Sequence, residues 1–184
     1  LAAAALQTKA NRDLKIRVGA LIRVMQDRKG KWSVTQTPEV EAAYVSLNAN
    51  NGAYRALVGG FDFNRKKFNH VTSGWRQPGS SIKPFVYSAA LEKGFSPETL
   101  INDVPLSETT DELLTWDPRN DDGQYDGPIE MQQALAQSKN VVSVRILKAI
   151  GASYGKDFLS RFGFDANKHP LNLTMALGTG SVTP

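Results

Sequence analysis

The sequence predicts an α+β domain in which β-hairpins come first and helices follow. Two features predict this order. An Asn-Gly pair at Asn51–Gly52, the strongest short hairpin signal, separates two strand-like runs, 42–47 and 53–58. Farther along, apolar residues recur at helical spacing in 82–90 and in 141–150. With 41% hydrophobic and 22% charged residues in 184, the composition is that of a globular domain with one sizeable core.

The N-terminal segment contains a further predicted hairpin. Residues 1–7 favour a helix, and the runs 16–25 and 32–35 are typical of two strands around the turn Asp27–Gly30. The later hairpin around Gly52 is expected at an edge of the core sheet.

A basic loop that contains several aromatic residues runs from Phe61 to Trp75. The helix over 82–90 follows it, and Gly94 is well placed to end that helix. Ser80 is therefore expected at or near a helix N-terminus. Pro84 lies in the first turns, where proline costs least.

The second half of the chain alternates loops with helices. Residues 96–127 are rich in Pro, Asp, Asn and Gly and predict a long loop with short elements, a kind of segment that often carries function. Three helices are then expected, at 129–136, 141–150 and 156–162. The polar residues 137–140 separate the first two, and 176–184 form a tail of small residues.

Ser80 and Lys83 form a Ser-x-x-Lys pair, and this spacing on a helix brings two side chains onto one face. A serine hydroxyl is a weak nucleophile until a neighbouring base takes its proton. A lysine is such a base only when burial or a nearby cation lowers its pKa. At a helix N-terminus, the backbone N–H of Ser80 would also stabilise the oxyanion of an acyl transfer.

Ser138 and Asn140 form a Ser-x-Asn turn between two predicted helices. Short polar side chains held rigidly at such a turn suit two tasks. Ser138 would relay a proton between Lys83 and a leaving amine, and Asn140 would hydrogen-bond a substrate amide.

Both patterns occur twice, so spacing alone does not select a site. Ser153–Lys156 is a second Ser-x-x-Lys, and Ser46–Asn48 is a second Ser-x-Asn. Without catalysis, Ser80 would be a helix cap and Lys83 a solvated lysine, and the turn 138–140 would be an ordinary cap between helices.

A Gly-x-Ser-x-Gly motif at 151–155 competes for the nucleophile. Such an elbow requires a preceding strand, whereas 141–150 predicts a helix. His169 and Asp165 complete the order of a triad, but they follow too closely for the intervening elements. We expect a flexible interhelical turn at 151–155.

Other function classes receive little support. The chain has no cysteine, so thiol nucleophiles, disulfides and thiolate metal sites are excluded. His70 and His169 have no partner spaced to share a metal, so both are expected on the surface, and no metal or cofactor is expected. The 22 basic and 18 acidic residues are interspersed, which argues against nucleic-acid binding.

Targeting signals are absent from the chain itself. No apolar run approaches the roughly 20 residues needed to cross a bilayer, and residues 1–6 lack the basic flank of a secretory signal. Because the sequence opens at Leu1 without a methionine, a piece of a longer protein is expected.

Residues 76–85 resemble the nucleophile segment of the bifunctional, class A penicillin-binding proteins, close to the 1A type of Gram-negative bacteria. Upstream, 40–60 resembles the hairpin that opens the transpeptidase domain of that family, and 61–69 resembles the next loop. Three downstream segments appear in family order: 116–120, 137–140 and 177–184. The resemblance covers about residues 37–184 in one register.

This resemblance implies the serine β-lactamase and penicillin-binding-protein-like fold, an antiparallel sheet flanked by helices. Residues 37–184 would be the N-terminal part of the transpeptidase domain, and 1–36 the end of an interdomain OB-like or linker region. No stretch resembles the glycosyltransferase. The family also implies a full-length protein anchored at the periplasmic face of the inner membrane, with an N-terminal glycosyltransferase domain.

The family mechanism carries over to particular residues. It implies that Ser80 attacks the D-Ala-D-Ala bond of a peptidoglycan stem peptide, with Lys83 as base, Ser138 as proton relay and Asn140 on the donor amide. An amine of a neighbouring stem peptide then forms the cross-link, and β-lactams would acylate the same serine. Trp116 and Asn120 resemble residues that border the substrate cleft, or they pack the loop.

The Lys-Thr-Gly motif of the family is absent from these 184 residues. Its strand supplies the second oxyanion-hole donor, and losing one such donor costs about 100- to 1,000-fold in rate. We therefore expect this chain alone to be inactive. Two alternatives stay open: a non-catalytic β-lactam sensor or scaffold, and a class A β-lactamase, against which the lack of a Glu-x-x-Leu-Asn stretch argues.

Overall fold

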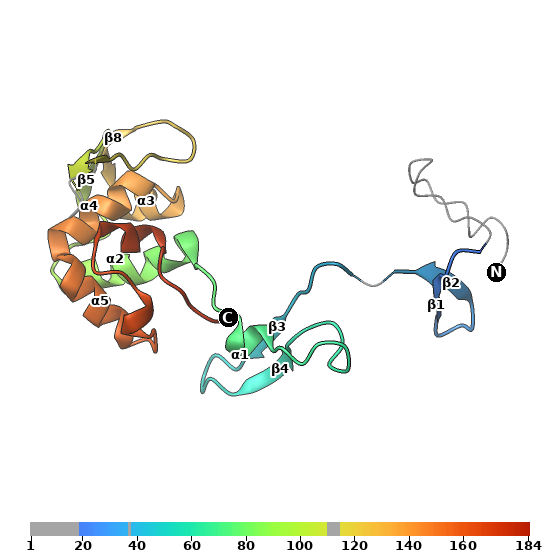
Figure 1. Cartoon of the computed structure of the whole chain (residues 1–184). Coiled ribbons are helices and arrows are strands. Elements are labelled where there is room, and N and C mark those ends of the chain that lie inside the picture. The colour runs from blue at the N-terminus through green and yellow to red at the C-terminus, as the bar shows by residue number, and fades with distance from the viewer. Residues whose placement is uncertain (1–18, 37, 110–114) are drawn as a thin grey trace. The chain divides into compact units, whose positions relative to one another are not determined.

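The computed structural model describes residues 19–36, 38–109 and 115–184 (Figure 1). These residues fall into two compact units, which divide after Phe68. The helix predicted over 1–7 and the start of the first predicted strand lie outside the described residues.

The first unit contains two antiparallel hairpins, β1 (Arg23–Gln26) with β2 (Trp32–Thr35) and β3 (Tyr44–Leu47) with β4 (Tyr54–Val58). Both predicted hairpins are thus confirmed. The first turn is closed by Asp27, whose Oδ1 accepts the N–H groups of Lys29 at 2.8 Å and Lys31 at 2.9 Å. A carboxylate that satisfies two turn amides fixes the hairpin locally.

Nothing in the described residues tests the expected place of the second hairpin at an edge of the core sheet, which stays a prediction. Among these residues, strands β3 and β4 pair only with each other. Tyr54 is 64% exposed and Val58 is 51% exposed. An isolated two-stranded hairpin is only marginally stable, and further strands or a helix are needed to bury such side chains.

The second unit, Asn69–Pro184, opens with the short helix α1 (His70–Ser73) and then reaches the helix predicted at 82–90. That helix is α2 (Lys83–Glu92), preceded by the 3₁₀ turn η3 (Gly79–Ile82). Ser80 lies in this 3₁₀ turn, three residues before the first residue of α2. Gly94 ends the helix with φ 92°, a conformation that glycine adopts without steric cost.

The predicted long loop holds three short strands, β5 (Leu100–Asp103), β6 (Glu108–Thr109) and β7 (Thr115–Trp116). Strand β6 pairs antiparallel with β7. Strand β8 (Gly127–Glu130) pairs antiparallel with β5 (Figure 1). Helix α3 (Met131–Ala136) therefore begins two residues later than predicted. The helix begins later because Ile129 and Glu130 belong to β8, where they pair with Ile101 and Leu100 of β5.

Helices α4 (Asn140–Ile150) and α5 (Ala152–Ser160) follow. The first matches its prediction. The second begins at Ala152, four residues earlier than predicted, so the expected flexible turn at 151–155 is wrong. Gly151, with φ 89°, reverses the chain in one residue. Gly155 then allows close packing, since a Cβ there would lie 2.6 Å from Leu147 Cδ1.

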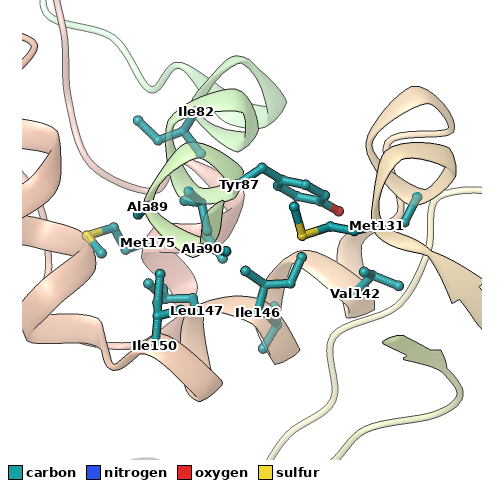
Figure 2. Packing of buried hydrophobic residues seen from close by; sticks show 14 of the residues in the cluster. Ile82, Tyr87, Ala89, Ala90, Met131, Val142, Ile146, Leu147, Ile150 and Met175 are labelled. Atoms are coloured by element: carbon teal, nitrogen blue, oxygen red, sulfur yellow. The ribbon is translucent and has the colours of Figure 1, made fainter. Parts of the chain in front are cut away.

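The core of the second unit lies between α2 and the helices that surround it. Figure 2 shows Ala89 and Ala90 of α2 beside Ile146 and Leu147 of α4, and Met175 also lies in this cluster. These five residues are fully buried. The small alanines let α4 approach α2 closely, which brings the N-terminal ends of the two helices together.

Candidate active site

Lys83 is the first residue of α2 and is only 1% exposed. Its ammonium donates three hydrogen bonds: to Ser138 O at 2.7 Å, to Ser138 Oγ at 3.0 Å and to Asn140 Oδ1 at 2.6 Å. The structure therefore brings the lysine of the Ser-x-x-Lys pair onto both polar residues of the Ser-x-Asn turn. All three donors of the ammonium are used.

Burial lowers the pKa of Lys83 below its ordinary value, and the carboxylate of Asp121 opposes that shift. Removing a charged amine from water favours its neutral form. A neutral amine accepts a proton, so this environment suits a general base.

Ser80 lies three residues before Lys83 and is exposed to solvent. The Lys83 backbone N–H donates to the Ser80 carbonyl, which closes the 3₁₀ turn. In the described part of the chain, no hydrogen bond joins the Ser80 hydroxyl to the Lys83 amine, although we expected the two groups to meet. The amine instead directs all its donors at the 138–140 turn, because that turn supplies three oxygens around it.

Ser138 has a left-handed backbone with φ 56° and is the one non-glycine residue with positive φ in the described ranges. This conformation costs an L-residue roughly 1–2 kcal/mol. Hydrogen bonds on both sides hold it, from Ser138 N–H to Leu135 O at 3.0 Å and from Lys139 N–H to Ala134 O at 2.9 Å. The turn aims both the carbonyl and the hydroxyl of Ser138 at Lys83. Strain of this kind concentrates at functional sites.

The Asn140 amide is held from its other side. Its Nδ2 donates to Arg119 O at 2.9 Å and to Asp121 Oδ1 at 3.0 Å. This fixes which amide atom faces Lys83, because the nitrogen is taken up by two acceptors. No motif in the sequence pointed to Asp121. Its only signal was a place in the turn-rich run that follows Pro118.

Asn120 is buried, at 5% exposed, and lies behind the Ser-x-Asn turn. Its Oδ1 accepts the N–H groups of Asn140 at 2.9 Å and Val141 at 3.2 Å, and its Nδ2 donates to Asp103 Oδ1 at 2.8 Å. Asn120 thereby caps the first turn of α4, where backbone donors have no partner within the helix. Its contact with substrate stays a prediction.

Trp116 is half-buried in β7 and packs against the core. It lines a cavity of about 290 Å³ with residues of β6 and of the segment 171–174. The hydrogen bonds of the Lys83 amine in the described chain go to Ser138 and Asn140 and to none of these residues. Its predicted place at the substrate cleft stays a prediction.

Lys139 is the middle residue of the Ser-x-Asn turn. It is 3% exposed, and its ammonium lies among three carboxylates: Asp126 at 2.9 Å, Asp122 at 3.3 Å and Asp103 at 3.4 Å. The hydrogen bond to Asp126 is the main reason why the pKa of Lys139 is raised. Asp103 is the last residue of β5, and no sequence pattern pointed to this cluster.

Gly178 packs directly on the residue that precedes Ser80. The Gly79 N–H donates to Gly178 O at 3.4 Å, and Gly178 adopts φ 73°. A Cβ at position 178 would overlap the Gly79 backbone. The C-terminal turn therefore supports the segment that carries Ser80.

The competing motifs lie elsewhere. Ser153 and Lys156 are both within α5, and helix α4 precedes them, so the strand that a nucleophile elbow needs is replaced by a helix. Ser46 lies in β3. These placements agree with the rejection of the elbow.

The expectation that His169 lies on the surface is wrong. The ring is 3% exposed and packs against Gly180 and the edge of Phe164. Burial is the main reason why its pKa is lowered. The local sequence gave no signal for this burial, because the residues that cover the ring follow in the tail. Across the described ranges, no group of His, Asp and Glu side chains could hold a metal ion.

Comparison with known proteins identifies the family. The model of the penicillin binding protein transpeptidase domain matches residues 42–176. The chain belongs to this transpeptidase family. It is also similar to penicillin-binding protein 1A of Neisseria lactamica, with 50% identity over all of this chain and 23% of that protein. Penicillin-binding protein 1A of Escherichia coli K12 is 49% identical over 83% of this chain and 18% of its own length.

The crystal structure of penicillin-binding protein 1A from Haemophilus influenzae resembles this transpeptidase chain with a TM-score of 0.81 and 41% identity. The match covers 89% of this chain and 24% of that one. The predicted α+β transpeptidase fold and the predicted family are thus confirmed. The chain spans about a quarter of the length of the relatives that it matches. Within the described residues, no helix has the length and apolar character that a membrane span needs.

Proposed function

We propose that this transpeptidase chain carries the acylating residues of a peptidoglycan D,D-transpeptidase, with Ser80 as nucleophile. One observation supports this most strongly: the buried amine of Lys83, one turn after Ser80, lies within hydrogen-bond distance of Ser138 Oγ and Asn140 Oδ1. A lysine with a lowered pKa beside an exposed serine and a second hydroxyl is an arrangement suited to acyl transfer.

In the acylation step, Ser80 Oγ attacks the carbonyl carbon between the two D-Ala residues of a donor stem peptide. Its proton passes to the neutral Lys83 amine as the new C–O bond forms. The hydroxyl must turn toward the amine for this transfer, and catalytic hydrogen bonds often tighten only when substrate is bound. The Ser80 N–H, in the 3₁₀ turn, would stabilise the negative oxygen of the tetrahedral intermediate.

Collapse of the intermediate breaks the C–N bond and releases D-Ala. Ser138 Oγ, 3.0 Å from Lys83 Nζ, gives its proton to the leaving amine and takes one from Lys83. Asn140 would hold the amide of the donor peptide. An amine of a neighbouring stem peptide then attacks the ester carbonyl and loses a proton to Lys83. The ester C–O bond breaks as the new C–N bond of the cross-link is completed, and Ser80 Oγ takes the proton back from Lys83.

The same chemistry extends to the expected partners and location. β-Lactams would acylate Ser80 as mimics of the donor peptide. We propose that the complete protein also has a glycosyltransferase domain and works at the periplasmic face of the inner membrane. The Lys-Thr-Gly strand that the family uses would come from outside these 184 residues.

The decisive test is covalent labelling of the longer protein, extended through its Lys-Thr-Gly strand, with a fluorescent penicillin. Native protein and Ser153→Ala should be labelled, and Ser80→Ala should not. Loss of label in Ser153→Ala alone would overturn the assignment. Labelled protein that never joins stem peptides would indicate a sensor, and fast turnover of penicillin would indicate a β-lactamase.

A further inference from the structure

We propose that Lys139, through its buried ion pair with Asp103, is a positioning residue that holds Ser138 and Asn140 on the catalytic lysine. The inference rests on the proposed function. Lys139 touches no reacting atom in this scheme. It acts through its two sequence neighbours, which both contact Lys83.

The carboxylates around the Lys139 ammonium differ in burial. Asp103 is fully buried, whereas the Asp122 and Asp126 side chains are 55% and 44% exposed. A buried lysine costs free energy unless it is paired, so an inward-pointing Lys139 is held in place by these carboxylates. Because Lys139 lies between Ser138 and Asn140, fixing its side chain fixes the backbone of the turn.

A second tether holds the Lys139 carbonyl. Ser143 Oγ donates to that carbonyl at 2.8 Å and lies 3.4 Å from the Tyr87 hydroxyl. Tyr87 is buried on α2, one turn beyond Lys83. The turn is thus linked through Ser143 to the helix that carries the catalytic lysine.

Asp103 binds two residues, Lys139 and Asn120. It pairs with Lys139 and also accepts from Asn120 Nδ2 at 2.8 Å, while Asn120 Oδ1 binds the N–H of Asn140. One buried carboxylate at the end of β5 therefore sets the position of the turn from both the side chain of Lys139 and the start of α4.

The strained backbone of Ser138 explains why the turn must be held in place. A left-handed serine relaxes toward ordinary conformations unless its surroundings prevent it. If Lys139 were released, the Ser138 hydroxyl and carbonyl would move away from Lys83. A shift of about 1 Å in a catalytic group can slow a reaction by about 100-fold.

The test uses the longer protein that contains this chain and measures acylation by a fluorescent penicillin. The rate constant of acylation and the dissociation constant of the non-covalent complex are separated by varying the penicillin concentration. Lys139→Met is compared with Lys148→Met, an exposed lysine of α4 that pairs with Glu108 at 2.6 Å. Since Lys139→Met leaves Asp103 buried without a cation, the double variant Asp103→Asn/Lys139→Met provides a second test without an unpaired charge.

We expect the Lys139 variants to lose about 10- to 100-fold in the rate constant of acylation, with a dissociation constant within about twofold of native. Lys148→Met should match native protein in both constants. Native-like circular dichroism and a cooperative melting transition show that the variants are folded.

A folded Lys139 variant, single or double, that acylates as fast as Lys148→Met would overturn the inference, even if its melting temperature is lower. In that case Lys139 would only stabilise the fold. Label retained by Ser80→Ala would instead refute the proposed function, so the two failures are distinguishable.

Discussion

Lys83 Nζ and Asn140 Oδ1 lie 2.6 Å apart although 57 positions separate the two residues in the sequence. The contact joins the first residue of α2 to the first residue of α4. Because the helices pack through the small residues of α2, their N-terminal ends are fixed relative to each other by the core. The candidate site is therefore positioned by the most buried part of the fold.

Replacement of Lys83 by methionine should abolish efficient acylation. A general base contributes about 100- to 10,000-fold, so we expect a loss of at least about 100-fold in labelling rate. Methionine fits the buried space but leaves Ser138 O and Asn140 Oδ1 without a donor, which should cost about 1–3 kcal/mol of stability. The measurement is labelling with fluorescent penicillin, together with thermal unfolding.

Lys93→Met is the matched control, because Lys93 is an exposed lysine at the C-terminal end of the same helix. It should label at the native rate. A Lys83→Met protein that also labels at the native rate would remove the lysine from the mechanism.

The rate of acylation should rise with pH through the lowered pKa of Lys83. Burial lowers that pKa below 10.5, and only the neutral amine accepts the serine proton. The free energy of unfolding should also rise with pH. Between the folded pKa and 10.5 the unfolded chain keeps a proton that the folded chain has released, so stability rises with pH in this window. A labelling rate that rises only near the ordinary lysine pKa would contradict this assignment.

Asp121→Asn should move that pH profile toward lower pH. The Asp121 carboxylate raises the pKa of Lys83, and asparagine removes the charge while its Oδ1 can still accept from Asn140 Nδ2. The profile of Asp157→Asn, an exposed residue of α5, should stay at the native position. Equal profiles for the two variants would show that Asp121 does not act on Lys83.

Local sequence signals predicted most of the helices and hairpins. The Asn-Gly turn, the helical spacing in α2 and α4, and Gly94 each specify structure through nearby residues alone. The errors arose where distant residues decide. Ile129 belongs to β8 because it pairs with Ile101, and His169 is buried because the tail covers it.

The residues of the candidate site also divide into those that local motifs predict and those that distant contacts determine. Two short motifs predicted that Lys83, Ser138 and Asn140 would meet, and the resemblance to a family selected the copies of the motifs that the structure brings together. Local sequence patterns could not predict the residues that support the site. Lys139 and Asp103 look like ordinary surface residues in sequence, and only the packing of α4 against β5 shows that they are buried together.

Gly178→Ala should slow acylation without altering any predicted catalytic residue. Gly178 and Gly123 both have positive φ, 73° and 67°, so alanine at either position pays a backbone cost of roughly 1–2 kcal/mol. They differ in surroundings. A Cβ at Gly178 would overlap the Gly79 backbone, whereas one at Gly123 would meet nothing within 4 Å.

The two variants therefore separate the effect of backbone strain from the effect of displacing Ser80. Gly123→Ala should lower the melting temperature slightly and keep the native labelling rate. Gly178→Ala should melt lower still and label about 10- to 100-fold more slowly, because pushing Gly79 aside moves Ser80 relative to Lys83. Equal labelling rates would mean that the contact between Gly178 and Gly79 supports the fold but not the position of Ser80.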